Sequence, residues 1–160
     1  MQGRESSPPS DQRIRIELMD WATAQSDALT IRYAVFVTEQ GVPIELERDE
    51  HDATSVHAVA YSPDGRVLGT GRLLPDGHIG RMAVSREARG LGVGGNILEA
   101  LVDHAHTLGH AQAVLNAQCH AQDFYGAHGF VARGEIFDDA GIDHIQMVRD
   151  LGPGEGSGRH

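Results

Sequence analysis

A glycine-rich turn between an apolar strand and an amphipathic helix constrains this chain more than any other feature. The strand is predicted over residues 79–84, and the helix runs from Gly92 to about 108. Glycines at 90, 92, 94 and 95 leave the start of the helix without side chains. The amides at a helix N-terminus lack intrahelical partners and carry partial positive charge. The segment therefore predicts a phosphate-binding site at the helix start.

The same glycines satisfy G-x-G-x-x-G at Gly90, Gly92 and Gly95, which is the dinucleotide-binding fingerprint. That fingerprint turns directly out of a parallel strand and has an acidic residue roughly 20 positions later. Here a polar turn over 85–89 intervenes, and the residues around 115 include no carboxylate. A P-loop is excluded because no Gly-Lys-Ser/Thr follows. A purely structural interpretation, in which the glycines allow close helix packing, stays open.

Arg89-x-x-Gly92-x-Gly94 behind a strand resembles the acyl-CoA-binding signature of the GNAT acetyltransferase superfamily. Two further segments, 35–43 and 116–130, are similar to its ElaA-like branch, so the resemblance covers roughly residues 30–148. It implies a mixed α/β (α+β) GNAT fold with a central, mostly antiparallel sheet. In that fold one parallel strand pair splays around acyl-CoA, and helices flank the sheet.

The length of 160 residues and the 40% hydrophobic content predict one domain, over 13–151. The ends, 1–12 and 152–160, are rich in Gly, Pro and Ser and are predicted to be flexible tails. We find no signal peptide and no apolar run that could span a membrane. The single cysteine, Cys119, excludes an internal disulfide and favours the reducing cytoplasm.

The formal charge of −10, from 13 Lys and Arg against 23 Asp and Glu, argues against partners that are nucleic acids or anionic membranes. A cationic substrate fits this charge better. The partner expected from the resemblance is a small-molecule or peptide amine. A homodimer stays open as the assembly.

The first half of the chain is predicted to contain strands joined by short turns, and strands joined in this way pair antiparallel. These strands are predicted over 13–18, 56–61, 66–74 and 78–84. Between the first two, a helix over 20–40 stops at Gly41-Val-Pro43. The acidic segment 45–52 that follows is interpreted as a solvated turn, with a substrate site as the alternative.

The back half alternates helices with strands. Strands are predicted over 113–117, 130–134 and 142–148, and helices over 92–108 and 119–128. Because a helix joins strand 78–84 to strand 113–117, these two should be parallel neighbours.

The resemblance implies which residues hold the coenzyme. Backbone groups of Met82, Ala83 and Val84 would bond the pantetheine arm. The pyrophosphate would lie on Arg89 and the helix start, that is Gly90, Leu91, Gly92, Val93, Gly94 and Gly95. Gln118 stands where the family usually has Asn, seven residues before Tyr125, and its amide can also bond the coenzyme. Arg89 as a simple exposed loop charge stays open.

Acetyl transfer to an amine needs a base, because an alkylammonium with a pKa near 10.4 is only about 1 part in 2,500 neutral at pH 7. In many GNAT enzymes an acid on the central strand helps, but strand 78–84 contains none. Glu39 is the first candidate, with Asp49, Glu50 and His144 behind it. A structural hydrogen bond from Glu39 at a helix end is the alternative.

Tyr125 matches the family's tyrosine, which is placed to protonate the departing coenzyme thiolate. A core tyrosine at a helix end is the alternative. We considered Cys119 as an acylated nucleophile with His120 or His128 as base and set it aside, because nothing in the spacing requires it. His106 and His110 are four apart, but Gly109 ends the helix between them, so no metal site is expected.

The expected function is therefore acetyl-CoA-dependent N-acetyl transfer to a primary amine, by direct attack in a ternary complex. An acyltransferase with a longer acyl donor is one alternative, because the segment 35–43 is also similar to acyl-homoserine-lactone synthases. A non-catalytic acyl-CoA-binding sensor is the other.

Overall fold

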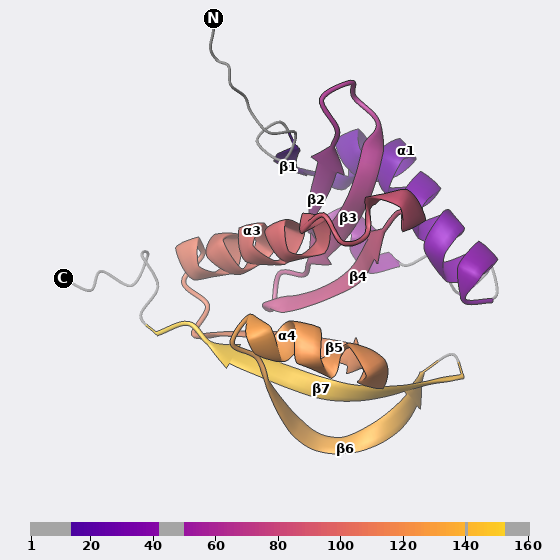
Figure 1. Ribbon diagram of the computed structural model, residues 1–160. Coiled ribbons are helices and arrows are strands. Elements are labelled where there is room, and N and C mark those ends of the chain that lie inside the picture. The colour runs from indigo at the N-terminus through magenta and orange to yellow at the C-terminus, as the bar shows by residue number, and fades with distance from the viewer. Residues whose placement is uncertain (1–13, 42–49, 140, 153–160) are drawn as a thin grey trace, which may run out of the picture.

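The computed structural model describes residues 14–41, 50–139 and 141–152 (Figure 1). Within these residues seven strands form one sheet in the order β1-β2-β3-β4-β5-β7-β6. The strands are β1 (Arg15–Met19), β2 (Val56–Tyr61), β3 (Val67–Leu73), β4 (His78–Val84), β5 (Gln112–Gln118), β6 (Val131–Asp139) and β7 (Ile142–Asp150). No helix in this part of the chain is long and apolar enough to cross a membrane.

The sheet is antiparallel except at one strand pair. β1 to β4 pair in chain order as antiparallel neighbours, and β7 pairs antiparallel with both β5 and β6. β4 and β5 are parallel, joined by a crossover through α3 (Val93–Thr107). The predicted mixed fold with one parallel pair is confirmed.

The parallel pair is short. In the described chain, β4 and β5 face each other at His78↔Val114 and Ile79↔Leu115. Beyond this point the β3–β4 register shifts between Thr70 and Arg72, and Arg81 of β4 has a φ of 51°. A left-handed conformation at a residue other than glycine is strained and marks a local break in the strand. β4 therefore separates from β5 toward its C-terminal end.

Two helices cover opposite faces of the sheet (Figure 1). Val59 and Tyr61 of β2 pack with Ala24 of α1 (Trp21–Arg32), whereas Ala58 and Ala60 pack with the buried face of α3. This alternation along β2 is what a strand buried on both sides requires. Hydrophobic side chains are therefore packed on both faces of the sheet.

Two glycines of β3 let α3 approach the sheet. A Cβ on Gly71 would lie 2.7 Å from Met82 Sδ and 2.9 Å from Ile97 Cγ2. A Cβ on Gly69 would lie 2.9 Å from the carbonyl oxygen of Ala83. No side chain fits at either position, so the glycines fix how closely α3 packs on the strand.

The predicted helix over 20–40 is two segments. α1 starts after Asp20, whose side chain accepts a bond from the Thr23 amide at 3.0 Å, and ends at Arg32. The chain continues as a π-helix, η3 (Tyr33–Glu39), over the β-branched stretch. π-Helical turns are rare and are often found at functional sites. Here the turn brings Phe36 and Gln40 to the cleft described below.

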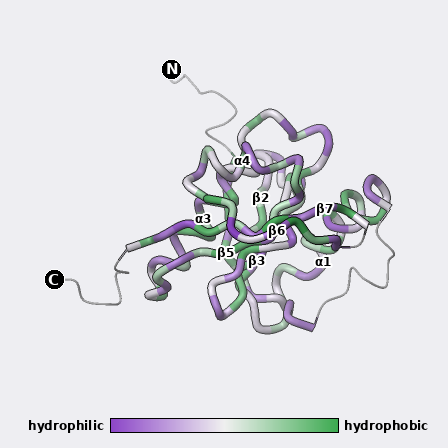
Figure 2. The backbone as a smooth tube through the Cα atoms, turned by 90° about the horizontal axis from the view of Figure 1, so that it is seen from below, coloured by the Kyte–Doolittle hydropathy of each residue, from purple (hydrophilic) through white to green (hydrophobic). Residues whose placement is uncertain are grey.

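The segment 119–128 folds as a 3-10 turn, η6 (Cys119–Ala121), followed by a short helix, α4 (Gln122–Ala127). The prediction that the next strand ends at 134 was wrong, because β6 continues to Asp139 across a register shift between Arg133 and Phe137. β6 is one of the two edge strands, with β1 at the other edge, and it exposes Val131, Ile136 and Phe137. Figure 2 shows hydrophobic segments on this side of the molecule.

One acidic side chain of the predicted solvated turn is buried. Asp52, in the 3-10 helix η4 (Glu50–Thr54), is 3% exposed and accepts bonds from Arg32 Nη1 and Nη2 at 3.1 and 3.0 Å. Arg72 Nη1 lies 3.0 Å from the same carboxylate. The solvated interpretation is therefore wrong for Asp52. Glu45, Glu47 and Asp49 lie outside the described residues.

Candidate active site

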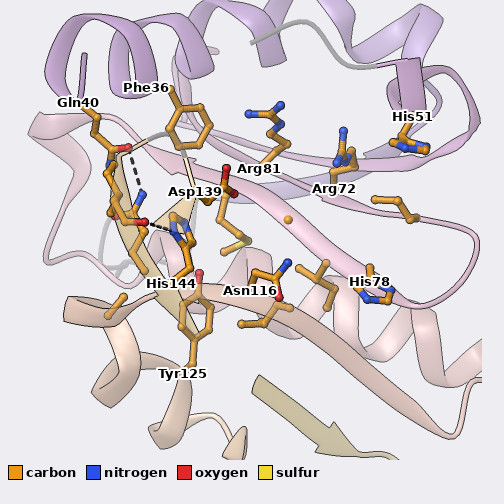
Figure 3. A pocket seen from close by; sticks show the side chains of 18 of the residues that line it. Phe36, Gln40, His51, Arg72, His78, Arg81, Asn116, Tyr125, Asp139 and His144 are labelled. Atoms are coloured by element: carbon orange, nitrogen blue, oxygen red, sulfur yellow. Dashed lines mark hydrogen bonds between the residues drawn. The ribbon is translucent and has the colours of Figure 1, made fainter. Parts of the chain in front are cut away.

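A cleft of about 690 Å³ opens where β4 separates from β5 (Figure 3). Phe36 of η3, Tyr125 of α4 and His144 of β7 point into it from three different elements. Four of the candidate residues from the sequence line it, namely Met82, Gln118, Tyr125 and His144. The volume is that of a typical small-molecule site.

Tyr125 combines a packed ring with a hydroxyl in the cleft. Its ring packs edge-on against Phe124 and Phe130, with ring centroids 5.0 and 6.2 Å apart, and belongs to the border of the main core. Burial raises the pKa of the Tyr125 phenol to about 12. The hydroxyl therefore stays protonated at any physiological pH and can donate a hydrogen bond.

His144 presents one defined ring nitrogen to the cleft. The side chain is 9% exposed, and its ring stacks on Phe137 with centroids 5.9 Å apart. Nδ1 lies 2.7 Å from the carbonyl oxygen of Ile142. Because a carbonyl only accepts, Nδ1 must carry a hydrogen, and Nε2 of the neutral ring is then left with a lone pair. His144 can therefore accept a proton at Nε2.

Glu39 lies at the end of η3 and binds two guanidinium groups. Its Oε1 is 2.6 Å from Arg89 Nη2, and its Oε2 is 2.9 Å from both Arg89 Nη1 and Arg86 Nη2. The bonds from Arg89 hold the pKa of the Glu39 carboxyl below its usual range. Glu39 is not among the described residues that line the cleft. Its role as base stays a prediction, and the geometry is that of the structural alternative.

Arg89 is anchored on both sides. Its Nε and Nη2 donate to the carbonyl oxygen of Val84, at 3.2 and 3.0 Å, while the other side of the guanidinium meets Glu39. The side chain is 46% exposed, but it is no simple loop charge. It ties the end of β4 to the turn before α3.

The glycine turn has the backbone of an anion site. Gly90 and Gly92 have φ of 84° and 82°, which favours glycine strongly, and α3 starts directly after Gly92. The bond from the Asn96 amide to the Gly92 carbonyl oxygen is 3.0 Å, so the amides of residues 93–95 precede the first amide that donates within the helix. For Gly95 the close-packing interpretation also holds, since a Cβ there would lie 3.1 Å from His128 Nε2.

The other candidates are spread around the molecule. Glu50 is exposed on η4 and does not line the cleft, and Asp49 lies outside the described residues. His128, considered as a base for Cys119, is engaged instead by Glu99, with Nδ1 2.7 Å from Oε2. Within the described ranges, no group of three His, Cys, Asp or Glu side chains could hold a metal ion.

Sequence reasoning missed several residues of the cleft. Arg81 and Asn116 lie on the two diverging strands, while Phe36 lies on η3 and Gln40 directly follows it (Figure 3). Gln40 Oε1 accepts a bond from Gln118 Nε2 at 3.1 Å. The sequence placed Arg81 and Asn116 on the predicted strands 78–84 and 113–117. It did not indicate which side chains of these strands turn toward the opening.

Comparison with known proteins agrees with this geometry. Residues 10–151 match the family model of the acetyltransferase (GNAT) domain. An uncharacterized N-acetyltransferase of Bacillus subtilis, YjcF, is 42% identical over 128 residues, which cover 78% of this chain and 91% of YjcF. Protein ElaA of Escherichia coli is 32% identical over 130 residues, with 77% and 85% covered.

Solved structures give the same result. An acyl-CoA N-acyltransferase from Pseudomonas aeruginosa superposes with a TM-score of 0.77 at 34% identity, covering 85% of this chain and 99% of that one. Escherichia coli ElaA superposes with a TM-score of 0.76 at 28% identity, covering 86% and 99%. The chain therefore belongs to the GNAT acetyltransferase family and is an enzyme of the acyltransferase type that uses an acyl-CoA cosubstrate.

Proposed function

We propose that this enzyme transfers an acetyl group from acetyl-CoA to a primary amine, by direct attack of the amine in a ternary complex. The observation that carries the proposal is the pairing of two groups in one cleft: a proton acceptor, His144 Nε2, and a proton donor, the Tyr125 hydroxyl. Both face the opening between β4 and β5. Such a pair is what amine acylation requires.

The residues present fit acyl-CoA. Two residue pairs join β4 to β5, and beyond them Met82 lines the cleft. Ala83 and Val84 follow it on β4, and the backbone of these three residues would bond the amide-bearing arm. No atom lies within 4 Å of a Cβ built on Gly90 or Gly92, so side chains do not crowd the turn. The amides at the start of α3 would hold the phosphates.

The amine must lose a proton before it can attack. Holding an alkylamine neutral at pH 7 costs about 4.6 kcal/mol when no base helps. We assign this role to His144, whose Nε2 would accept the proton while Nδ1 stays bonded to the Ile142 carbonyl. The assignment of Glu39 as the base stays the competing prediction, and its two arginine partners make it a weaker acceptor.

Acetyl-CoA supplies the acetyl group as an activated thioester. Tyr125 would donate a hydrogen bond to the sulfur as it leaves. A phenol with a pKa of about 12 is a weaker acid than a thiol, whose pKa is about 8.5. Tyr125 therefore stabilises the departing thiolate by its hydrogen bond, and a full proton transfer is completed only with help from solvent or the amine-derived proton.

Amine-dependent thiol release tests this function. The protein is incubated with acetyl-CoA and a panel of primary amines, and free thiol is followed with a colorimetric reagent. Thiol release that requires an amine, together with an acetylated amine product, is expected. Faster release from longer acyl-CoA donors would make the enzyme a longer-chain acyltransferase. Acetyl-CoA binding without release for any amine would favour the sensor.

A further inference from the structure

The end of η3 reaches both walls of the opening between β4 and β5. Glu39 contacts Arg86 and Arg89 in the turn after β4, and the next residue, Gln40, bonds Gln118 at the end of β5. Backbone pairs join the two strands only at their other end in the described chain. Side chains of two adjacent residues thus connect the strands where the backbone does not.

Of the two arginines, Arg89 makes more hydrogen bonds to protein groups. A guanidinium has five N–H donors in a fixed fork. Arg89 donates four hydrogen bonds to protein groups, two to the Val84 carbonyl oxygen and one to each carboxylate oxygen of Glu39. This pattern is typical of an arginine that holds a turn in shape, and it leaves one N–H for a ligand.

The turn that Arg89 holds leads directly into the anion site. Val84 ends β4, and Gly90 and Gly92 follow Arg89 with the left-handed conformations that aim the α3 amides. Glu39 holds the guanidinium through both of its carboxylate oxygens, and its side chain is only 19% exposed. A change at Glu39 therefore reaches the phosphate-binding amides through Arg89.

We propose that Glu39 is a positioning residue for acyl-CoA binding, which acts through Arg89 on the turn between β4 and α3. The inference rests on the proposed function, because it takes acyl-CoA to bind at this turn. It differs from the base assignment, in which Glu39 would affect turnover. It also differs from competition, in which Glu39 would occupy cations that the phosphates need.

The three roles predict different changes in CoA affinity and turnover when the Glu39 carboxylate is removed. Removing the Glu39 carboxylate leaves one more positive charge beside the anion site, so simple competition predicts tighter CoA binding. A positioning role predicts weaker CoA binding instead, because the amides lose their fixed geometry. The base role predicts unchanged CoA binding and a loss of turnover that shrinks as pH rises.

A double-mutant cycle on CoA affinity tests the proposal. Glu39→Gln keeps the shape and removes the charge, and Arg89→Lys keeps the charge and removes the fork. We expect each single variant to raise the Kd for CoA by about tenfold in titration calorimetry, as for coupled contacts. The double variant should bind no more weakly than the weaker single one. At saturating acetyl-CoA, kcat of Glu39→Gln should stay near wild type from pH 6 to about pH 9.

Glu17→Gln is the matched control, because it removes the same charge from the exposed Arg15–Glu17 pair on β1 and should leave the Kd unchanged. Melting curves establish that each variant is folded, and Glu39→Gln by itself gives the direction in which the CoA affinity changes. Tighter CoA binding by Glu39→Gln, additive losses in the double variant, or full affinity in Arg89→Lys would each overturn the proposal. Wild-type protein that binds no CoA would instead refute the proposed function.

Discussion

At the scale of single residues, His144 and Glu39 compete for the role of proton acceptor, and their surroundings differ. His144 lines the cleft and has a ring nitrogen with a lone pair directed away from its carbonyl partner. Glu39 is bound by two arginines, which stabilise its charged form and lower its pKa. A carboxylate that gains little from protonation is a poor base. The geometry thus favours His144.

A pair of variants should show which of the two residues is the proton acceptor. His144→Gln should lower kcat on the order of 10²-fold at pH 7, the usual size of one general base. Part of the loss should return as the pH approaches the amine pKa, about 10.4, because the free amine becomes abundant. Glu39→Gln should show no such recovery. The measurement is kcat against pH for both variants. Recovery in Glu39→Gln and full activity in His144→Gln would return the role to Glu39.

Tyr125→Phe should lower turnover and spare binding. The hydroxyl acts only on the departing thiolate, so we expect kcat to fall on the order of 10²-fold with the Kd for CoA nearly unchanged. The ring still fills its place against Phe124 and Phe130, so the fold should survive. Steady-state kinetics and CoA titration on the same preparation give both values. A fully active variant would mean that the thiolate leaves with solvent help alone.

Most of the cleft residues that were predicted came from a motif, whereas His144, a further candidate for the base, came without one. Tyr125, Gln118 and Met82 came from the resemblance, and all three line the cleft, although their roles stay predictions. The bond between Glu39 and Arg89 joins residues 50 apart in the chain. Burial of Asp52 likewise depends on distant arginines. No local pattern contains such contacts, because tertiary packing creates them.

At the scale of elements, local signals predicted most of the sheet. Alternating polarity and Pro- or Gly-containing turns predicted the hairpin strands, and the helix between β4 and β5 predicted their parallel pairing, which is confirmed. The π-helical η3 could not be foreseen, because helical periodicity does not report an extra residue per turn. β6 is longer than predicted because a register shift lets the strand continue past Gly134.

The packing of α3 on β3 should be sensitive to one added methyl group. Gly71→Ala would place a Cβ against Met82 and Ile97, at 2.7 and 2.9 Å, and should lower the free energy of unfolding by about 1–3 kcal/mol. Gly126→Ala is the matched control, because a Cβ there meets nothing within 4 Å and lies in helix α4. Urea unfolding measures both variants. A Gly71→Ala variant as stable as the wild-type protein would show that α3 can move away from β3 without a cost in stability.

At the scale of the whole molecule, buried phenols should limit stability in alkali. Burial raises the pKa of both Tyr61 and Tyr125 from 10.0 to about 12 in the folded protein. The folded state then binds more protons than the unfolded state between these values, so stability is complete below pH 10 and falls as pH rises toward 12. Melting temperatures across this range should drop, and Tyr125→Phe should flatten the drop. A melting temperature independent of pH would contradict the raised pKa values.

Every catalytic assignment depends on acyl-CoA binding at the glycine turn between β4 and α3. Titration calorimetry with CoA and with NAD tests this most directly, on wild-type protein and on Gly94→Asp, which adds a negative charge at the start of α3. We predict that wild-type protein binds CoA and does not bind NAD, and that Gly94→Asp, folded by its melting curve, loses the CoA signal. NAD binding without CoA binding, or full CoA affinity in Gly94→Asp, would contradict the account.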